Sequence, residues 1–364
     1  MASLNYLGSK KSLMPYIAHV VDKIIDANDS MQFQFCDLFS GSGCVSNYYK
    51  NHPRISSVLS NDMEIYAYVI SRALLKCEMN HRLAKVIDRL NIMCSKIDES
   101  SCACSYDLVT RVFASGGRMY FTFSNALKID RVRQSIGELF SKNVVSYDEF
   151  VFLLASLLCS ASAVSNTCGT FRAHLKHISL RAKKTFKLSP VHQDHLIFGR
   201  SKNIVKNKNA INIDNVKDGA IVYLDPPYTS AHYGAYYSFL NYLCIYNSRE
   251  KTVGTGILVD YNKSRFGLVK HAYAEFKKLL FNPCAKAAHI ILSYSSCGII
   301  HIDTLVNLLR KRGNVIVYKI WYKAYKANQN SKRGHVVEYL IHLECCNDDS
   351  LGKSGSISKV WLRI

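Results

Sequence analysis

The chain has 364 residues, of which 48% are hydrophobic and 20% are charged, values typical of a soluble globular protein. It has no apolar run of the ~18 residues that a membrane span needs, and its first residues lack the apolar core and cleavage site of a signal peptide. We therefore expect neither a membrane-spanning nor a secreted protein. We expect a cytoplasmic protein with one large α/β domain and an insertion, or with two domains.

Positive charge is the strongest signal in the composition. The 47 Lys and Arg residues outnumber the 27 Asp and Glu residues, which gives a formal net charge of +20. A surplus of this size predicts a polyanionic partner, and nucleic acid is the most common one. A basic surface that serves only solubility is the alternative.

The 13 cysteines give a weaker signal. They are scattered along the chain, and no Cys-x-x-Cys pair is followed by a second pair at the spacing of a zinc site. We therefore expect free, mostly buried thiols in a reducing compartment and no metal site.

Strand-like and helix-like segments alternate in two parts of the chain. Residues 32–76 have the pattern strand, helix, strand, helix, and residues 215–345 continue the alternation with the buried strands "AIVYLD", "HIILSY" and "VIVYKIWY". A last strand, "VEYLIHLEC", follows a short polar loop, so we expect it to pair antiparallel. The alternation predicts an α/β fold with a doubly wound, mostly parallel sheet and a final antiparallel strand.

The segment between these two parts has a different character. Residues 77–199 interrupt the alternation, and their first half is helical in pattern. Residues 166–209 contain ten Lys and Arg but one acid. We predict a discontinuous catalytic domain (1–76 and 200–347), an inserted region (77–199) whose downstream part binds a polyanion, and a C-terminal tail (348–364). Residues 348–358 of this tail are rich in Ser and Gly, and we expect them to be loosely ordered.

A glycine-rich turn follows the first predicted strand in the stretch "CDLFSGSG". Glycines let the backbone turn tightly and approach a ligand, and the second predicted strand ends in acids that suit ribose hydroxyls. The spacing F-x-G-x-G differs from the G-x-G-x-x-G of dinucleotide enzymes, so it favours a cofactor with adenosine but no pyrophosphate, and S-adenosylmethionine fits. The candidate residues are Asp37, Phe39, Gly41, Gly43, Asp62 and Glu64.

The stretch "YLDPPY" places a carboxylate, two prolines and an aromatic ring directly after a buried strand. An exocyclic amine on a nucleobase is a poor nucleophile, because its lone pair is delocalised into the ring. Asp225 and the main-chain carbonyl of Pro226 can accept hydrogen bonds from such an amine, Pro227 stiffens the backbone, and Tyr228 offers a face for stacking an extruded base. A simple strand-to-loop turn with a solvent-facing Asp is the alternative.

These segments resemble a known family. "NYLGSK" (5–10), "DLFSGSG" (37–43), "SNDME" (60–64) and "YLDPPY" (223–228) are similar to motifs of the Dam-like class of DNA adenine-N6 methyltransferases. Further stretches resemble the branch found in type II and type IIS restriction–modification systems, and the resemblance covers most of residues 5–345. It implies a Rossmann-like methyltransferase sheet with a largely helical, inserted DNA-recognition region.

The resemblance also implies roles for the matching residues. Asp62, or as a second choice Glu64, would bind the ribose of the cofactor, and Ser201 stands where relatives carry an acid near the adenine ring. The residues implied to hold the methionine end of S-adenosylmethionine are Tyr6, Gly8 and Lys10. Three more residues are implied to line the same cofactor: Phe39, Gly41 and Gly43. The residues expected to meet DNA are Arg172, Lys176, Arg181, Lys183, Lys184 and Lys187.

The implied function is sequence-specific transfer of a methyl group from S-adenosylmethionine to N6 of a flipped adenine. The partner would be double-stranded DNA, a cognate restriction endonuclease would act in the same system, and the enzyme would be a monomer. Two alternatives stay open at this point. One is an amino-methyltransferase acting on cytosine N4 or on RNA adenine, and the other is a catalytically dead DNA-binding relative.

Overall fold

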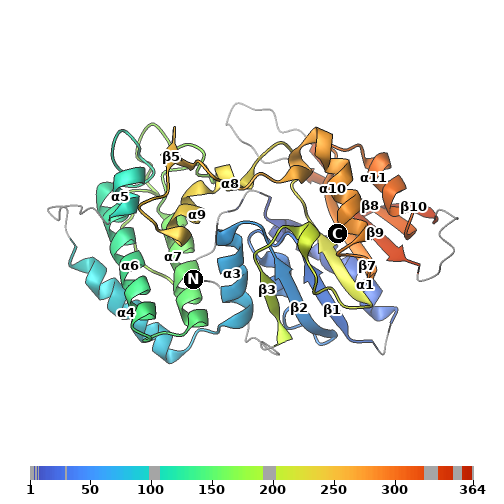
Figure 1. The fold of residues 1–364 in the computed structure, drawn as a ribbon, viewed down its shortest axis with the longest axis horizontal. Coiled ribbons are helices and arrows are strands. Elements are labelled where there is room, and N and C mark those ends of the chain that lie inside the picture. Colours follow the sequence, from blue (N-terminus) through green and yellow to red (C-terminus); the bar gives the residue numbers. More distant parts are fainter. Residues whose placement is uncertain are drawn as a thin grey trace. The chain divides into compact units, whose positions relative to one another are not determined.

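The computed structural model describes residues 4, 6, 8–28, 31–97, 107–191, 202–323, 335–346 and 355–362. They form two compact units, each assembled from separate parts of the chain (Figure 1). The helical unit comprises residues 1–8, 64–200 and 233–263, and the sheet unit comprises residues 9–63, 201–232 and 264–364. The units differ from the predicted domains, because residues 1–8, residues 64–76 and the segment 233–263 belong to the helical unit.

The sheet unit is built on eight strands in the order β10-β8-β9-β7-β4-β1-β2-β3. All neighbouring strands are parallel except that β9 runs antiparallel to both β7 and β8. This confirms the expected large, mostly parallel α/β sheet. The strands are β1 (Phe33–Asp37), β2 (Ile55–Asn61), β3 (Ile204–Lys206), β4 (Ala220–Leu224), β7 (Ala287–Ser295), β8 (Gly313–Lys323), β9 (His335–Cys345) and β10 (Ile357–Trp361).

One strand was not expected from the sequence. The antiparallel strand β9 is not the last, since β10 follows it and pairs parallel with β8 at the edge of the sheet. Its side chains are all exposed, so the stretch lacks the apolar alternation that identifies a half-buried strand. The prediction of loose order for residues 348–358 is therefore wrong for residues 357 and 358.

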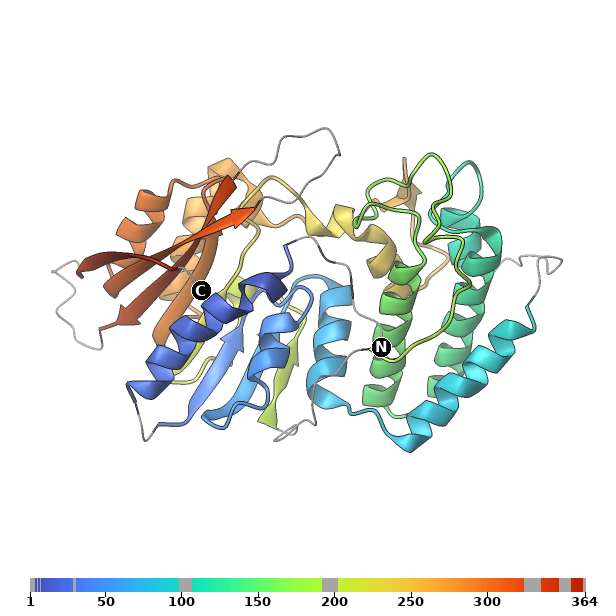
Figure 2. The same cartoon turned by 180° about the vertical axis from the view of Figure 1, so that it is seen from behind.

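Helices cover both faces of the sheet. Alternate residues of β4, namely Ala220, Val222 and Leu224, lie in a core shared with α10 and α11, while α1 lies on the face seen in Figure 2. The strand β4 is buried along its whole length for this reason. The helices of this unit are α1 (Met14–Asp26), α2 (Cys44–Tyr49), α10 (Val269–Phe281) and α11 (Ile302–Leu309), and a short 3-10 helix, η1 (Lys10–Leu13), precedes α1.

The helical unit is organised around α7, which is apolar on nearly every side and is buried against α3 and α6. Its start is fixed by a capping box between Ser146 and Glu149. The helices are α3 (Ile65–Lys76), α4 (His81–Ser95), α5 (Leu108–Phe113), α6 (Phe123–Ser141), α7 (Tyr147–Ala163), α8 (Tyr233–Tyr236) and α9 (Ser238–Ile245), and a two-stranded ribbon joins β5 (Thr252–Val253) to β6 (Ile257–Leu258).

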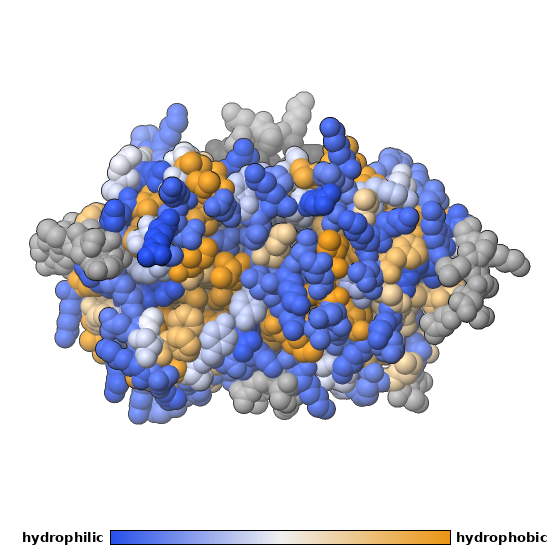
Figure 3. Space-filling model, in the orientation of Figure 1, coloured by the Kyte–Doolittle hydropathy of each residue, from blue (hydrophilic) through white to orange (hydrophobic). Residues whose placement is uncertain are grey.

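Hydrophilic residues predominate on the face of the molecule shown in Figure 3, where smaller hydrophobic areas interrupt them. Within the part of the chain that the structure describes, none of the helices is both long and apolar enough to cross a lipid bilayer.

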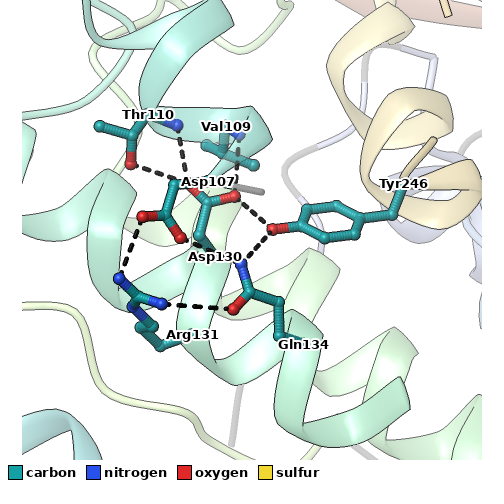
Figure 4. A network of polar contacts seen from close by, with 7 residues as sticks. All are labelled: Asp107, Val109, Thr110, Asp130, Arg131, Gln134 and Tyr246. Atoms are coloured by element: carbon teal, nitrogen blue, oxygen red, sulfur yellow. Dashed lines mark hydrogen bonds and ion pairs between the residues drawn. The ribbon is translucent and has the colours of Figure 1, made fainter. Parts of the chain in front are cut away.

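A buried carboxylate in α6 holds three helices of the helical unit together (Figure 4). Asp130 accepts hydrogen bonds from the backbone N–H groups of Val109 and Thr110, both at 2.8 Å, and from the Thr110 hydroxyl at 2.7 Å. It also accepts one at 2.7 Å from the hydroxyl of Tyr246, the residue that ends α9. Asp130 therefore satisfies the N-terminal N–H groups of α5, which would otherwise be buried without partners.

Asp107 has the usual position of a helix cap, yet its side chain makes no capping bond to α5. Its carboxylate instead accepts hydrogen bonds from Arg131 at 3.1 Å and from Gln134 at 3.0 Å, as Figure 4 shows. The two aspartates thus exchange roles: the residue before α5 binds α6, and a residue of α6 caps α5. Such a network fixes the packing of the helices because each member depends on the others.

Replacing Asp130 tests this network. Burial raises the pKa of Asp130 to about 6, although its hydrogen bonds oppose the rise. Because this pKa is above that of the unfolded chain, the stabilisation is complete below about pH 4 and declines as the pH rises through 6. We expect Asp130→Asn to lower the free energy of unfolding by about 1–3 kcal/mol at pH 4.5. The loss should shrink towards pH 7, as measured by urea unfolding. Asp88→Asn, at an exposed site on α4, should leave the free energy of unfolding unchanged at both pH values.

Candidate active site

The predicted motifs of the sheet unit meet at one edge of its sheet. Asp37 ends β1, Asp62 follows β2 and Asp225 follows β4. These strands are parallel neighbours, with β1 between β2 and β4, and the carboxyl ends of parallel strands lie at the same edge. Three acids that are far apart in sequence are brought together in this way.

A buried ion pair lies at the centre of this edge. The Lys10 ammonium, on η1, is 2.9 Å from Oδ1 of Asp225, and the two side chains are 6% and 16% exposed. Burial raises the pKa of Asp225, and the charge and hydrogen bond of Lys10 oppose that rise. Burial also disfavours the charged form of Lys10, but attraction to Asp225, Tyr228 and other acids leaves its pKa well above the ordinary value. Lys10 therefore stays protonated and keeps Asp225 in place.

The aromatic ring of the catalytic motif is supported from two sides. Lys10 Nζ lies 5.6 Å from the centroid of the Tyr228 ring, and a hydrogen bond from Lys10 opposes the rise in the pKa of Tyr228 that burial causes. The ring of Tyr294, on β7, contacts Tyr228 edge-on at 5.4 Å, while the N–H of Ile299 donates to the Tyr228 carbonyl at 2.8 Å. Pro226 is buried and Pro227 is half-buried, so the motif is held rigidly after β4.

Asp37 is a second buried carboxylate at this edge, with 1% of its surface exposed. It accepts a hydrogen bond from the Ser46 hydroxyl at 2.8 Å. Burial raises the pKa of Asp37 to about 7, the bond from Ser46 opposes this, and the charges of Asp225 and Asp62 add to the rise. This edge of the sheet is therefore rich in negative charge.

The glycine turn adopts the conformation that its sequence predicts. Gly41 and Gly43 have φ values of +49° and +73°, in the left-handed region where side chains are strained. The N–H of Gly41 donates to Oδ2 of Asp62 at 2.8 Å, which joins the loops that follow β1 and β2. Phe39 packs edge-on against Phe266 at 5.2 Å.

Asn61 is a residue of this edge that the sequence analysis missed. Its side-chain amide donates to the carbonyls of Leu38 and Lys208, both at 3.1 Å, and its oxygen accepts from the N–H of Lys208 at 3.1 Å. The loops after β1 and β3 are thereby fixed to the end of β2. No local pattern marks such an asparagine, because its partners come from distant segments.

Glu338 was also missed. It lies on β9, is 9% exposed, and has a pKa that burial raises to about 7 against the attraction of Lys10. In the sequence it is one of two glutamates in the predicted strand "VEYLIHLEC", and no local pattern distinguishes it from the exposed Glu344.

Two residues of the N-terminal motif belong to the helical unit. Tyr6 stacks on Tyr237 with ring centroids 4.9 Å apart and on Tyr233 at 5.6 Å. Gly8 has a φ of +80°, and a Cβ there would come within 2.9 Å of the Tyr233 hydroxyl. The backbone therefore requires glycine at this position.

Glu64, the second choice for the ribose, belongs to the helical unit as well. It is 6% exposed and accepts a hydrogen bond from the side chain of Asn241 at 2.6 Å. Asp62, in contrast, lies in the sheet unit beside Gly41. Asp62, the first choice for the ribose, therefore lies at the glycine turn, whereas the Glu64 side chain binds Asn241 within the helical unit.

The predicted DNA-binding residues lie in a basic segment, residues 165–191, that follows α7. Its lysines and Arg172 are exposed, and the Arg172 guanidinium lies over the ring of Tyr236 at 5.5 Å. Arg181 is not exposed like these residues. It is half-buried, and its guanidinium donates hydrogen bonds to the carbonyls of Ser165 and Thr167. The exposed lysines are Lys176, Lys183, Lys184 and Lys187.

Asparagine side chains hold the backbone of this basic segment in place of regular structure. Asn125 donates to the carbonyls of Ala182 and Lys184 and accepts from the N–H of Phe186. Asn166 accepts from the N–H of Ser179 at 3.0 Å. The lysines are therefore presented from a fixed backbone. Ser201, where an acid was expected, lies outside the described residues.

Comparison with known proteins identifies the family. A family model described as the D12 class N6 adenine-specific DNA methyltransferase matches residues 6–308. The chain belongs to this D12 class. The predicted resemblance and enzyme class, a site-specific DNA methyltransferase that acts on adenine, are thereby confirmed.

Relatives of this chain are named as modification enzymes. Over 99% of its length it is 33% identical to modification methylase LlaI of Lactococcus lactis subsp. lactis, of which it spans 58%. It is 33% identical to type II methyltransferase M.CviAII of Paramecium bursaria Chlorella virus 1 and 30% identical to M.NlaIII of Neisseria lactamica. The matches cover 94% of the chain and 98% and 99% of these two enzymes.

Proposed function

We propose that this chain transfers the methyl group of S-adenosylmethionine to N6 of an adenine in duplex DNA, at one short sequence. The observation that carries the proposal is the Asp225 carboxylate, which is half-buried, held by Lys10, and followed by two prolines and the half-buried Tyr228. This arrangement suits a nucleobase amine as the group that receives the methyl, because it combines a fixed hydrogen-bond acceptor with an aromatic face.

The residues of the motif divide the chemistry among them. Asp225 accepts a hydrogen bond from N6–H of the target adenine and the carbonyl of Pro226 accepts the other, so the nitrogen lone pair is drawn out of the ring. Tyr228 stacks on the base after it leaves the duplex. As the new N–C bond forms, the amine becomes positively charged and loses a proton, for which Asp225 is the first acceptor.

The donor groups of the sheet edge fit S-adenosylmethionine. Two carboxylates, Asp225 and Glu338, interact there with Lys10, and a third, Asp37, interacts with Asp225. This negative balance suits a ligand that carries a sulfonium charge. We assign Phe39, Gly41 and Gly43 to the cofactor and Asp62 to its ribose. Bound there, the cofactor supplies an electrophilic methyl group.

The two units receive separate roles in this proposal. The sheet unit is a Rossmann-like methyltransferase sheet that binds the cofactor and holds the target base. The helical unit carries the basic segment, and we propose that it recognises DNA. The relatives named as modification enzymes support a role in restriction–modification, with double-stranded DNA as substrate and an endonuclease of the same specificity as the functional partner.

Loss of the acceptor carboxylate provides the test of the proposed function. Asp225→Ala should lower methyl transfer at least ~100-fold, since it removes the hydrogen-bond acceptor and the first proton acceptor. Its affinity for S-adenosylmethionine should stay within about threefold, because other residues bind most of that molecule. The assay follows labelled methyl groups into duplex DNA, identifies N6-methyladenine by mass spectrometry, and measures cofactor binding by calorimetry.

The exposed Asp218, in the loop before β4, provides the matched control, and Asp218→Ala should leave both values unchanged. An Asp225→Ala variant with normal turnover would contradict the assignment of this site. Transfer to cytosine or to RNA, but not to adenine in duplex DNA, would contradict the proposed substrate.

The basic segment leads to a second prediction. If Lys183, Lys184 and Lys187 contact phosphates, replacing one of them with Ala should weaken binding to all DNA sequences alike. It should also flatten the plot of log K against log salt by about 0.9. Fluorescence anisotropy at several salt concentrations measures this slope. Lys277→Ala, an exposed site on α10, should not alter it, and an unchanged slope in the three variants would remove these lysines from the interface.

A further inference from the structure

Glu338 is a buried carboxylate that no motif explains. On β9 it stands opposite Ser295 of β7, and β7 in turn pairs with β4, where Leu292 stands opposite Leu224, the residue before Asp225. Two strand spacings, roughly 10 Å, therefore separate the backbones that carry the two acids. Lys10 interacts with both of them.

The surroundings of Glu338 are unfavourable for a residue with only a structural role. Its Oε2 is fully buried and accepts no hydrogen bond from any of the described residues, and its carboxylate otherwise receives a bond from the Ser295 hydroxyl. An apolar side chain would fill this place at lower cost, because a buried carboxylate without full hydrogen bonding is destabilising. Its retention in the site therefore points to the charge itself.

Among the described residues, four titratable or polar groups interact with Glu338: Lys10 from η1, Asp225 and Tyr228 from the segment after β4, and Ser295 from β7. Lys10 attracts Glu338, and Asp225 repels it. The Lys10 ammonium is thus attracted by two carboxylates, only one of which, Asp225, is in contact at 2.9 Å. The more negative charge Glu338 carries, the less Lys10 neutralises Asp225.

We propose that Glu338 is a positioning residue for adenine methylation, which draws on the Lys10 ammonium so that Asp225 remains a strong hydrogen-bond and proton acceptor. This inference rests on the proposed function. Glu338 does not touch the adenine in this scheme, and it acts through Lys10. Its effect therefore depends on its ionisation, whereas a purely structural role would not.

The inference predicts a specific pH dependence. Burial raises the pKa of Glu338 to about 7, and Lys10 and Ser295 oppose the rise. The side chain is therefore neutral at pH 6 and ionised at pH 8.5. The ratio of kcat in wild type to kcat in Glu338→Gln should be close to 1 at pH 6 and should rise to roughly tenfold at pH 8.5, the effect of about one pKa unit. Asp37 titrates in both proteins and cancels in the ratio.

Matched variants complete the test. Glu338→Asp keeps the charge and should keep the rise of kcat with pH, and Glu344→Gln, an exposed site on the same strand, should give a ratio of 1 throughout. Ser295→Ala removes a hydrogen bond to the carboxylate, so the rise should move to higher pH. Each variant is first checked for folding by circular dichroism and for affinity towards S-adenosylmethionine by calorimetry.

The possible outcomes separate the two proposals. A wild-type protein that does not methylate adenine in DNA overturns the proposed function. An active wild type with a ratio that is the same at every pH overturns the role of Glu338 alone. If Glu338→Gln is unfolded, the pH dependence of kcat in Ser295→Ala decides instead. A kcat that rises at the same pH in Ser295→Ala as in wild type then overturns the proposed role of Glu338.

Discussion

The buried ion pair between Lys10 and Asp225 is the constraint on which the site depends. A carboxylate removed from water is costly unless it is paired, and here a single lysine on η1 compensates it. The pair fixes the start of the sheet unit to the end of β4, positions the acceptor, and brings the Lys10 charge to the ring of Tyr228. A buried pair of this kind contributes little net stability, which agrees with our proposal that it serves to place the carboxylate for catalysis.

The remainder of the sheet edge surrounds this pair with negative charge. Asp37 and Glu338 are both buried, and both have pKa values raised to about 7. Perturbed groups gathered at the ends of parallel strands mark a functional site. The same charges that disfavour one another in the protein suit a cationic cofactor such as the one we propose for this site.

The parts of the fold and of the site that could be predicted are those whose signals lie within one short stretch of sequence. The glycine turn and the catalytic motif lie within single stretches, and their strands, turns and order along the chain were predicted correctly. Asn61 and Glu338 were not found, because their partners lie in other loops and strands, and sequence periodicity does not reveal such partners. Arg181 was grouped with the exposed lysines because charge alone does not distinguish a guanidinium that binds carbonyls of its own segment.

The most direct test of this account is a double-mutant cycle on the ion pair. The rate of methyl transfer to duplex DNA is measured for Lys10→Met, Asp225→Asn and the double variant. If Lys10 acts by holding Asp225, the double variant should be no slower than the slower single variant, since the second change removes an interaction that is already lost. If the two losses multiply instead, Lys10 and Asp225 act independently, and the central role of the pair is contradicted.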